Sequence, residues 1–286
     1  EICIYLSGFL WSLFPVITTL TFSRITPLFS AAISTLLAAV FFAAVLTAKK
    51  QWPCLRRRNA WKDILLTSLY IGVIFYGLIF LGIRRTTAGN ASIMSLMEIL
   101  FSFLILGLFL RHEKISVQRV LGGICMAAGA LVILLPKASG WHSGDLLVVL
   151  ATLFPPLGNK YAQQARRVVS AECIMFCRSV ISGCFLLLFA SLFEPVPTIP
   201  ALSSSIWFLL VNGLLLLGLS KILWIDGIHL IPITKAISLE SITPLFTLLV
   251  AFLVLHEPIF AYQILGLLPI MGGIWLLTKS HAHLDA

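Results

Sequence analysis

The hydrophobic residues of this chain fall into ten long runs, which short polar or proline-bearing breaks separate. A helix that crosses the hydrocarbon core of a bilayer needs about 20 mainly apolar residues, and most of the runs have this length. None shows the polar face, at a period of 3.6 residues, that a surface helix of a soluble protein turns to water. The pattern predicts an all-α polytopic membrane protein with ten transmembrane helices, at 2–22, 27–48, 64–83, 86–110, 117–135, 146–161, 171–193, 206–228, 232–255 and 260–278.

Composition supports a membrane protein and speaks against a nucleic-acid-binding one. Of the 286 residues, 59% are hydrophobic and 11% are charged, so the chain has more apolar surface than a soluble core could bury. The net charge of +9 comes mostly from Lys and Arg at the ends of the runs, where such residues set topology. We therefore expect the lipid bilayer as the surroundings of the chain, no nucleic acid among its partners, and a monomer.

The same basic residues predict the orientation in the membrane. Loop 49–62 carries six Lys and Arg residues, and loop 111–119 carries three. With Arg166, Arg167 and Lys279, twelve basic residues lie on this side of the predicted membrane and four lie on the other. Short loops rich in Lys and Arg stay in the cytoplasm. We therefore expect a multi-pass protein of the bacterial inner membrane with both termini cytoplasmic.

The two halves of the chain resemble each other. Leu13-Phe14-Pro15 recurs as Leu153-Phe154-Pro155, at an offset of 140 residues. Other matches have offsets of 144 or 145 residues: Gly82-Ile83 with Gly227-Ile228, Leu100-Phe101 with Leu245-Phe246, His112-Glu113 with His256-Glu257, and Gly122 with Gly266. A nearly constant offset across several helices predicts two five-helix repeats, 1–138 and 139–286.

An odd number of helices in each repeat means that the second repeat enters the bilayer in the opposite direction. The charge pattern supports this inversion independently, because the basic loop 49–62 corresponds to 194–205, which has no Lys or Arg. Loop 111–119 likewise corresponds to 256–263, again without them. Inverted repeats are typical of secondary transporters, whose substrate site lies near the midplane where the halves meet. A duplicated membrane scaffold without transport is the alternative.

The repeated motif resembles the EamA-type transporters of the drug/metabolite transporter superfamily, over nearly the whole chain. The residues that carry the resemblance are 95–101 with His112-Glu113 and Gly122-Gly123, then 242–246 with His256-Glu257 and Gly266, and Arg178. The resemblance implies a ten-helix secondary carrier of small organic metabolites, often an exporter, that needs no cofactor and hydrolyses no nucleotide. This family often has Pro where Ile99 follows Glu98, so the resemblance alone does not predict a break in the fourth helix.

Glu98 is the main candidate for substrate binding and proton coupling. It lies about halfway along the fourth run, where a charged side chain costs about 2.5–3.5 kcal/mol on insertion scales and so tends to face a wet interior. Ser92, Ser95 and Ser102 are spaced to share its helical face. Two roles stay open for Glu98: it binds an ammonium group or a coupling proton, or it pairs with a basic neighbour and fixes helix packing.

Further candidate substrate-binding residues also lie inside the runs: Glu240, Lys221, Lys160, Trp11, Tyr76, Asn90 and Arg178. The two lysines suit an acidic partner or a substrate carboxylate or phosphate, although Lys160 could instead reach the membrane surface through its long side chain. Trp11 and Tyr76 suit a cavity wall. Arg178 has helix packing as its alternative role.

Other chemistries find little support in the sequence. The six cysteines mostly lie in apolar runs without CxxC spacing, so free thiols are expected. The two His-Glu pairs would lie at opposite membrane faces, which speaks against a metal site. No GxxxxGK[ST] loop for nucleotide binding and no catalytic motif occurs.

We therefore expect a secondary transporter, an exporter rather than an importer, that moves small polar or amphipathic metabolites such as amino acids by alternating access. Proton exchange and facilitated diffusion both remain open. A multidrug effluxer of cationic compounds is one alternative, which cavity-facing lysines would disfavour. A membrane-embedded enzyme acting on lipid-linked substrates is another, which the scattered ionisable residues disfavour.

Overall fold

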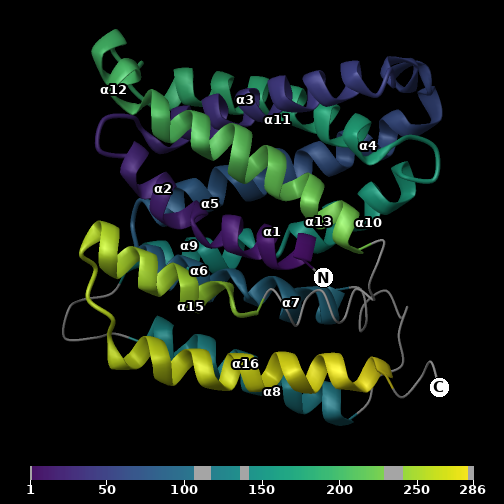
Figure 1. Cartoon of the computed structure of the whole chain (residues 1–286). Helices are drawn as coiled ribbons and strands as arrows, with labels where there is room; N and C mark the ends of the chain where they lie inside the picture. The colour runs from purple at the N-terminus through teal and green to yellow at the C-terminus, as the bar shows by residue number, and fades with distance from the viewer. Residues whose placement is uncertain (1, 106–116, 136–141, 229–240, 283–286) are drawn as a thin grey trace.

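The computed structural model describes residues 2–105, 117–135, 142–228 and 241–282, and these ranges are helical apart from short connections (Figure 1). Seven helical stretches in them are long and apolar enough to cross a membrane, and two shorter apolar helices, Thr243–Leu255 and Ala261–Leu277, accompany them. Together with the interrupted helix at 143–165, these segments correspond to the ten predicted spans. The prediction of an all-α, multi-pass membrane protein is confirmed.

The helices of the first repeat are α1 (Ile2–Ser12), α2 (Phe14–Thr21), α3 (Pro27–Ala48), α4 (Trp61–Thr67), α5 (Tyr76–Ile83), α6 (Ala88–Ser95), α7 (Met97–Ser102) and α8 (Val117–Leu134). Two 3₁₀ turns, η1 (Trp52–Arg56) and η2 (Arg58–Ala60), follow α3, and the π-helical segment η3 (Ser68–Phe75) joins α4 to α5.

The helices of the second repeat are α9 (Ser143–Ala151), α10 (Pro155–Ala165), α11 (Ala171–Phe193), α12 (Ile199–Leu210), α13 (Ser220–Ile228), α15 (Thr243–Val250) and α16 (Ala261–Ala282). The π-helical segments η5 (Val211–Leu219) and η6 (Ala251–Leu255) continue α12 and α15. The sixth span is longer at both ends than the predicted 146–161, because hydropathy ends a span at its first polar residues while the helix continues. The start of the ninth predicted span, 232–240, lies outside the described residues.

Helix interruptions occur at equivalent places in the two repeats. The first span is interrupted at Leu13 and the sixth at 152–154, each time next to a proline, Pro15 or Pro155. Proline lacks a backbone N–H and clashes with the carbonyl of the preceding turn, which interrupts a helix. The π segments η3 and η5 also occupy matching places in the third and eighth spans. Irregular turns in the middle of spans are frequent at functional sites, including transporter substrate sites.

Among the described helices, the fifth and tenth spans form one of the two most extensive pairs between the repeats. A Cβ atom on Gly122 of α8 would lie 2.8 Å from the carbonyl oxygen of Gly273 on α16, and one on Gly129 would lie 2.4 Å from that of Gly266. Only glycines permit so close an approach of two helix backbones. Residue numbers rise along α8 as they fall along α16, so the pair is antiparallel. Because these helices are repeat equivalents, the second repeat is inverted.

We expect Gly273→Val to destabilise the protein clearly and the neighbouring Gly272→Val to have little effect. A Cβ atom at Gly273 would lie 2.5 Å from the carbonyl oxygen of Gly122 and 2.9 Å from the backbone nitrogen of Met126, whereas nothing lies within 4 Å of one at Gly272. Overpacking of this kind typically costs about 1–3 kcal/mol. Thermal unfolding of the two variants in the same detergent measures the difference. Equal Tm values would contradict the close packing of α8 on α16.

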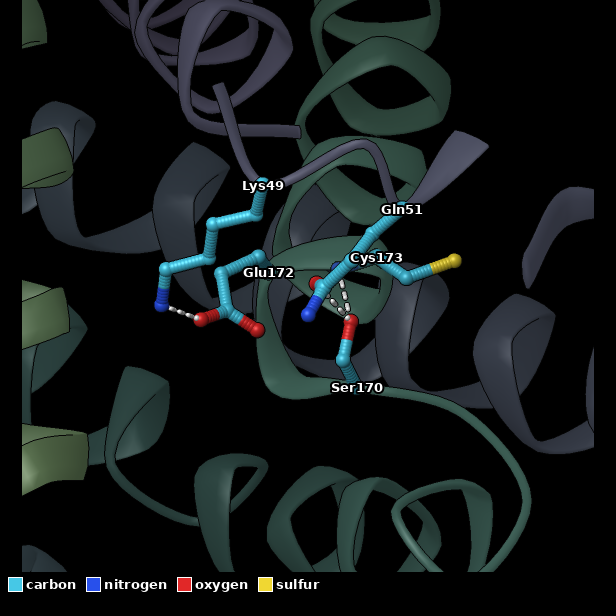
Figure 2. A network of polar contacts seen from close by, with 5 residues as sticks. All are labelled: Lys49, Gln51, Ser170, Glu172 and Cys173. Carbon is cyan, nitrogen blue, oxygen red and sulfur yellow. Dashed lines mark hydrogen bonds and ion pairs between the residues drawn. The ribbon is translucent and has the colours of Figure 1, made fainter. Parts of the chain in front are cut away.

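The second and seventh spans, α3 and α11, form the other pair (Figure 1). At the start of α3, the Glu194 carboxylate accepts hydrogen bonds from the backbone N–H groups of Leu28 and Phe29, at 3.0 and 3.2 Å. A carboxylate there satisfies free N–H groups and interacts favourably with the helix dipole. At the other end of the pair, Lys49 forms an ion pair with Glu172, 2.5 Å between Nζ and Oε1 (Figure 2). We call this end of the bundle, which carries loop 49–60, the basic end.

A disulfide between Cys54 and Cys173 also joins the two repeats at the basic end. Next to it, the Ser170 hydroxyl donates a hydrogen bond to Oε1 of Gln51, at 2.9 Å (Figure 2). The expectation of free thiols is therefore wrong for this pair, because the packing of α11 against the segment after α3 brings together cysteines 119 residues apart. The remaining cysteines are free: Cys3, Cys125, Cys177 and Cys184.

Cys54→Ser is expected to lower the thermal stability of the oxidised protein. Disulfides that close long loops restrict the unfolded chain and typically contribute about 2–4 kcal/mol. Cys184→Ser, which changes an exposed free cysteine, is the matched control. A reducing agent should bring the wild-type Tm down to that of the Cys54→Ser variant. A wild-type Tm that does not respond to the reducing agent would contradict this prediction.

Candidate functional site

Glu98 lies in the middle of the bundle, where α7 starts after a turn at Leu96, and it is half-buried. The side-chain amide of Asn159 on α10 donates a hydrogen bond to Glu98 Oε1, at 3.4 Å. Lys221 on α13 is close enough to interact electrostatically with the same carboxylate. Glu98 of the first repeat therefore lies close to the amide of Asn159 and the ammonium group of Lys221, both of the second repeat.

The ammonium group of Lys221 lies over an aromatic wall contributed by α1 and α2. Its Nζ atom is 3.5 Å from the centroid of the Trp11 ring, a cation–π arrangement. Trp11 in turn stacks on Phe14, with ring centroids 4.6 Å apart and 5° between the planes. Ser7 holds α1 to α13, because its hydroxyl donates a hydrogen bond to the carbonyl oxygen of Ser220, at 3.0 Å.

We call Glu98, Asn159, Lys221 and Trp11 the central cluster. Its members come from four spans and from both repeats, and none of them is fully buried. An acid, a cation and an aromatic ring that remain partly accessible inside the helix bundle can bind a small molecule with charges of both signs. Such charges inside a bilayer are costly, and they are typical of substrate and ion pathways.

Tyr76 and Arg178 lie in the packed interior. Tyr76 is 2% exposed and Arg178 is 4% exposed. The guanidinium carbon is 5.7 Å from the centroid of the Tyr76 ring, and Nη2 donates a hydrogen bond to the Tyr76 hydroxyl, at 3.4 Å. The pair ties α5 to α11. In this conformation it supports the helices around the central cluster and contributes little accessible surface.

The other candidates lie in different places. Lys160 is half-buried on α10, directly after Asn159, on the side of the cluster toward the basic end. Asn90 lies on α6, eight residues before Glu98 and thus about 12 Å along a helix. Glu240 lies outside the described residues.

The serines predicted to share a face with Glu98 do not form one stripe. Ser92 is buried and donates a hydrogen bond to the Thr247 hydroxyl on α15, at 2.9 Å. Ser95 bonds back to a carbonyl of its own helix. The helical period used for the prediction holds only for a continuous helix, and the turn at Leu96 separates α6 from α7.

A second polar cluster lies toward the end opposite the basic end. The side-chain amide of Asn90 donates hydrogen bonds to both carboxylate oxygens of Asp145, at 3.0 and 3.1 Å. Its oxygen accepts a hydrogen bond from Nε2 of Gln263, at 2.8 Å. Thr86 also donates to Asp145. Asp145 was not among the predicted site residues because it lies just outside the predicted span 146–161. Its position directly beside a span boundary is the sequence feature that could have identified it.

The two ends of the bundle differ in packing around the central cluster. Toward the opposite end, α6 packs closely against α2, α9 and α15. Toward the basic end, no comparably close packing joins α1 to α7 or α10 within the described ranges. Asn159 is exposed on this side. Within the described ranges, the central cluster is therefore closed toward the opposite end by α6 and its neighbours.

Known proteins share this architecture. The uncharacterized transporter YoaV of Bacillus subtilis is 27% identical, over 76% of this chain and 75% of its own length. The uncharacterized transporter YetK of the same organism is 26% identical, over 95% of this chain and 84% of its own length. Protein PecM of Dickeya dadantii is 28% identical over 75% of this chain and 72% of its own length. One solved crystal structure superposes with a TM-score of 0.71 at 16% identity, covering 100% of this chain and 98% of that one, and has the same fold.

The family assignment comes from both halves of the sequence. The EamA-like transporter family model matches residues 1–135 and again residues 142–279. These ranges hold the matched helix interruptions and the antiparallel glycine contacts described above. The chain belongs to the EamA-like transporter family.

Proposed function

We propose that this membrane transporter moves small zwitterionic metabolites, with amino acids as the expected class, and that the central cluster is its substrate site. The observation that carries the proposal is that Lys221, which lies over the Trp11 ring, also interacts with the partly accessible carboxylate of Glu98. A free amino acid carries an ammonium and a carboxylate group a few ångströms apart. Glu98 with Asn159 suits the first group, and Lys221 suits the second.

The aromatic wall adds a preference for substrates with an apolar part. A substrate side chain lying against the part of Trp11 that remains exposed would bury apolar surface, at about 25 cal/mol per Å². The charged groups fix the orientation of the substrate, and the wall contributes affinity. This combination, an apolar lining with a few placed polar groups, is usual for small-molecule sites.

Inverted repeats support alternating access as the mechanism. Because the two repeats have the same local structure in opposite orientations, exchanging their conformations turns a site open at one end into a site open at the other. From the positive-inside rule we expect the basic end and both termini in the cytoplasm of a bacterial cell. A proton taken up by Glu98 as the ammonium group leaves would couple export to the proton gradient.

A cationic-compound effluxer is the second candidate, since an acid beside aromatic rings also suits an organic cation. Lys221 opposes it, because its ammonium group occupies the face of Trp11 that a cation would use. Competition between substrates separates the two functions.

The test is transport by the purified protein in proteoliposomes. The panel contains radiolabelled amino acids, the amines that lack their carboxylates, and quaternary ammonium cations, each with and without a pH gradient. We expect saturable transport of at least one amino acid, inhibited by other amino acids. Empty liposomes are the control. Saturable transport of the cations alone, or of no member of the panel, would overturn the proposal.

A further inference from the structure

The polar cluster toward the opposite end connects helices of both repeats. Asn90 belongs to α6 of the first repeat, whereas Asp145 belongs to α9 and Gln263 to α16 of the second. All three side chains are buried, at 0%, 1% and 2% exposure. Asn90 is the centre of the cluster, because it bonds Asp145 through its nitrogen and Gln263 through its oxygen.

The neighbouring contacts hold the same helices. Glu257, which precedes α16, accepts a hydrogen bond from the backbone N–H of Ala88 at the start of α6, at 3.1 Å. Gln263 is itself oriented by the backbone N–H of Phe260, which donates to its oxygen at 3.0 Å. The start of α6 is therefore bonded to α9 on one side and to the segment around α16 on the other.

These helices close the central cluster off from the opposite end. α6 packs there against α2, α9 and α15, and Ser92 on α6 bonds Thr247 on α15. For the site to open toward this end, α6 has to separate from α9. The bonds between Asn90 and Asp145 must then break.

We infer that Asn90 and Asp145 form a latch that holds the gate at the opposite end closed and is released once in each transport cycle. The inference rests on the proposed alternating access. A polar latch suits a gate that must open, because the amide and the carboxylate exchange their mutual hydrogen bonds for bonds to the water that enters. An interface of apolar side chains would instead expose hydrophobic surface at each opening.

The pairing of an amide with a carboxylate can be tested by exchanging the two groups. In Asn90→Asp, two carboxylates face each other, and in Asp145→Asn, two amides do. The double variant Asn90→Asp/Asp145→Asn restores one amide and one carboxylate in reversed positions, and Gln263 can still donate to residue 90.

Hydrogen–deuterium exchange of the purified protein, measured without substrate, reports the opening of the gate. We expect Asn90→Asp to raise deuterium uptake at least two-fold in peptides from α6 and α9, and the double variant to return uptake to near the wild-type level. Ser68→Ala is the matched control, because Ser68 is also buried but bonds only within its own helix, to the carbonyl of Ile64. It should leave these peptides unchanged.

Two outcomes would overturn the latch: unchanged uptake in Asn90→Asp, or a double variant that behaves like Asn90→Asp. If Asn90→Asp does not run as a single species on size exclusion, Gln263→Met removes the neighbouring bond that orients the Asn90 amide toward Asp145 and should raise uptake in α6; no rise there would count against the latch. Because no substrate is present, these results do not depend on the cargo. A failed transport assay beside a confirmed latch would therefore reject only the proposed substrate class.

Discussion

Glu98→Gln is expected to abolish the response of transport to a pH gradient. Glutamine keeps the size of the side chain and an oxygen that accepts the hydrogen bond from Asn159, but it neither carries the negative charge nor takes up a proton. Transport driven by an imposed pH gradient should fall at least ten-fold. Exchange of labelled for unlabelled substrate without a gradient should stay measurable, because it needs no net proton movement.

Asp63→Asn is the matched control for this prediction. Asp63 is a half-buried acid in the first turn of α4 at the basic end, so its neutralisation removes the same charge from another place. The measurement is the initial rate in proteoliposomes over a series of internal and external pH values. An unchanged pH response together with unchanged affinity in Glu98→Gln would remove this residue from the mechanism and leave it a packing role.

Lys221→Met is expected to weaken the binding of substrates that carry a carboxylate. A charged hydrogen bond is worth about 1.5–3 kcal/mol, which corresponds to a rise in KM of roughly 10- to 150-fold. The amine that lacks the carboxylate should bind as well as before, or better, because the variant frees the face of Trp11 and removes a competing cation from Glu98. The informative quantity is therefore the ratio of the two KM values.

Lys62→Gln, which changes an exposed lysine at the basic end, should leave that ratio unchanged. A uniform loss for amino acids and amines in Lys221→Met would indicate that the lysine supports the fold of α1 on α13. A uniform loss would therefore contradict the assignment of Lys221 to the substrate carboxylate.

Several features of the molecule could be predicted because they depend on local composition. The bilayer requires long apolar segments, so the runs of the sequence predicted the spans to within a few residues; the largest error among the described residues is at the eighth span, which starts at Ile199 and was predicted to start at 206. The repeat offsets predicted that Gly122 and Gly266 are equivalent. In the structure both glycines lie in the contact between α8 and α16, where each faces a glycine of the other helix. Pro15 and Pro155 lie beside helix interruptions, as the missing N–H favours, whereas Pro269 lies inside the continuous helix α16.

Features that depend on contacts between distant residues could not be predicted in this way. No proline lies at the turn at Leu96, so the sequence did not predict this turn. Because of it, Ser92 does not share a helical face with Glu98. Asp145 gains its partner 55 residues away, from another span. The pairing of Cys54 with Cys173 likewise has no local signal.

The sequence by itself determined that the chain is a membrane protein of ten spans in two inverted repeats, and it indicated the acids and cations that such a protein can hold inside a bilayer. Only the tertiary structure decided which of these meet. The physical reason is that lipid imposes its constraint on every segment separately, through length and hydropathy. Which side chains of different helices become partners depends instead on the rotation of each helix, on its interruptions and on where it crosses its neighbours. These features place Lys221 against Trp11 and Asn90 against Asp145.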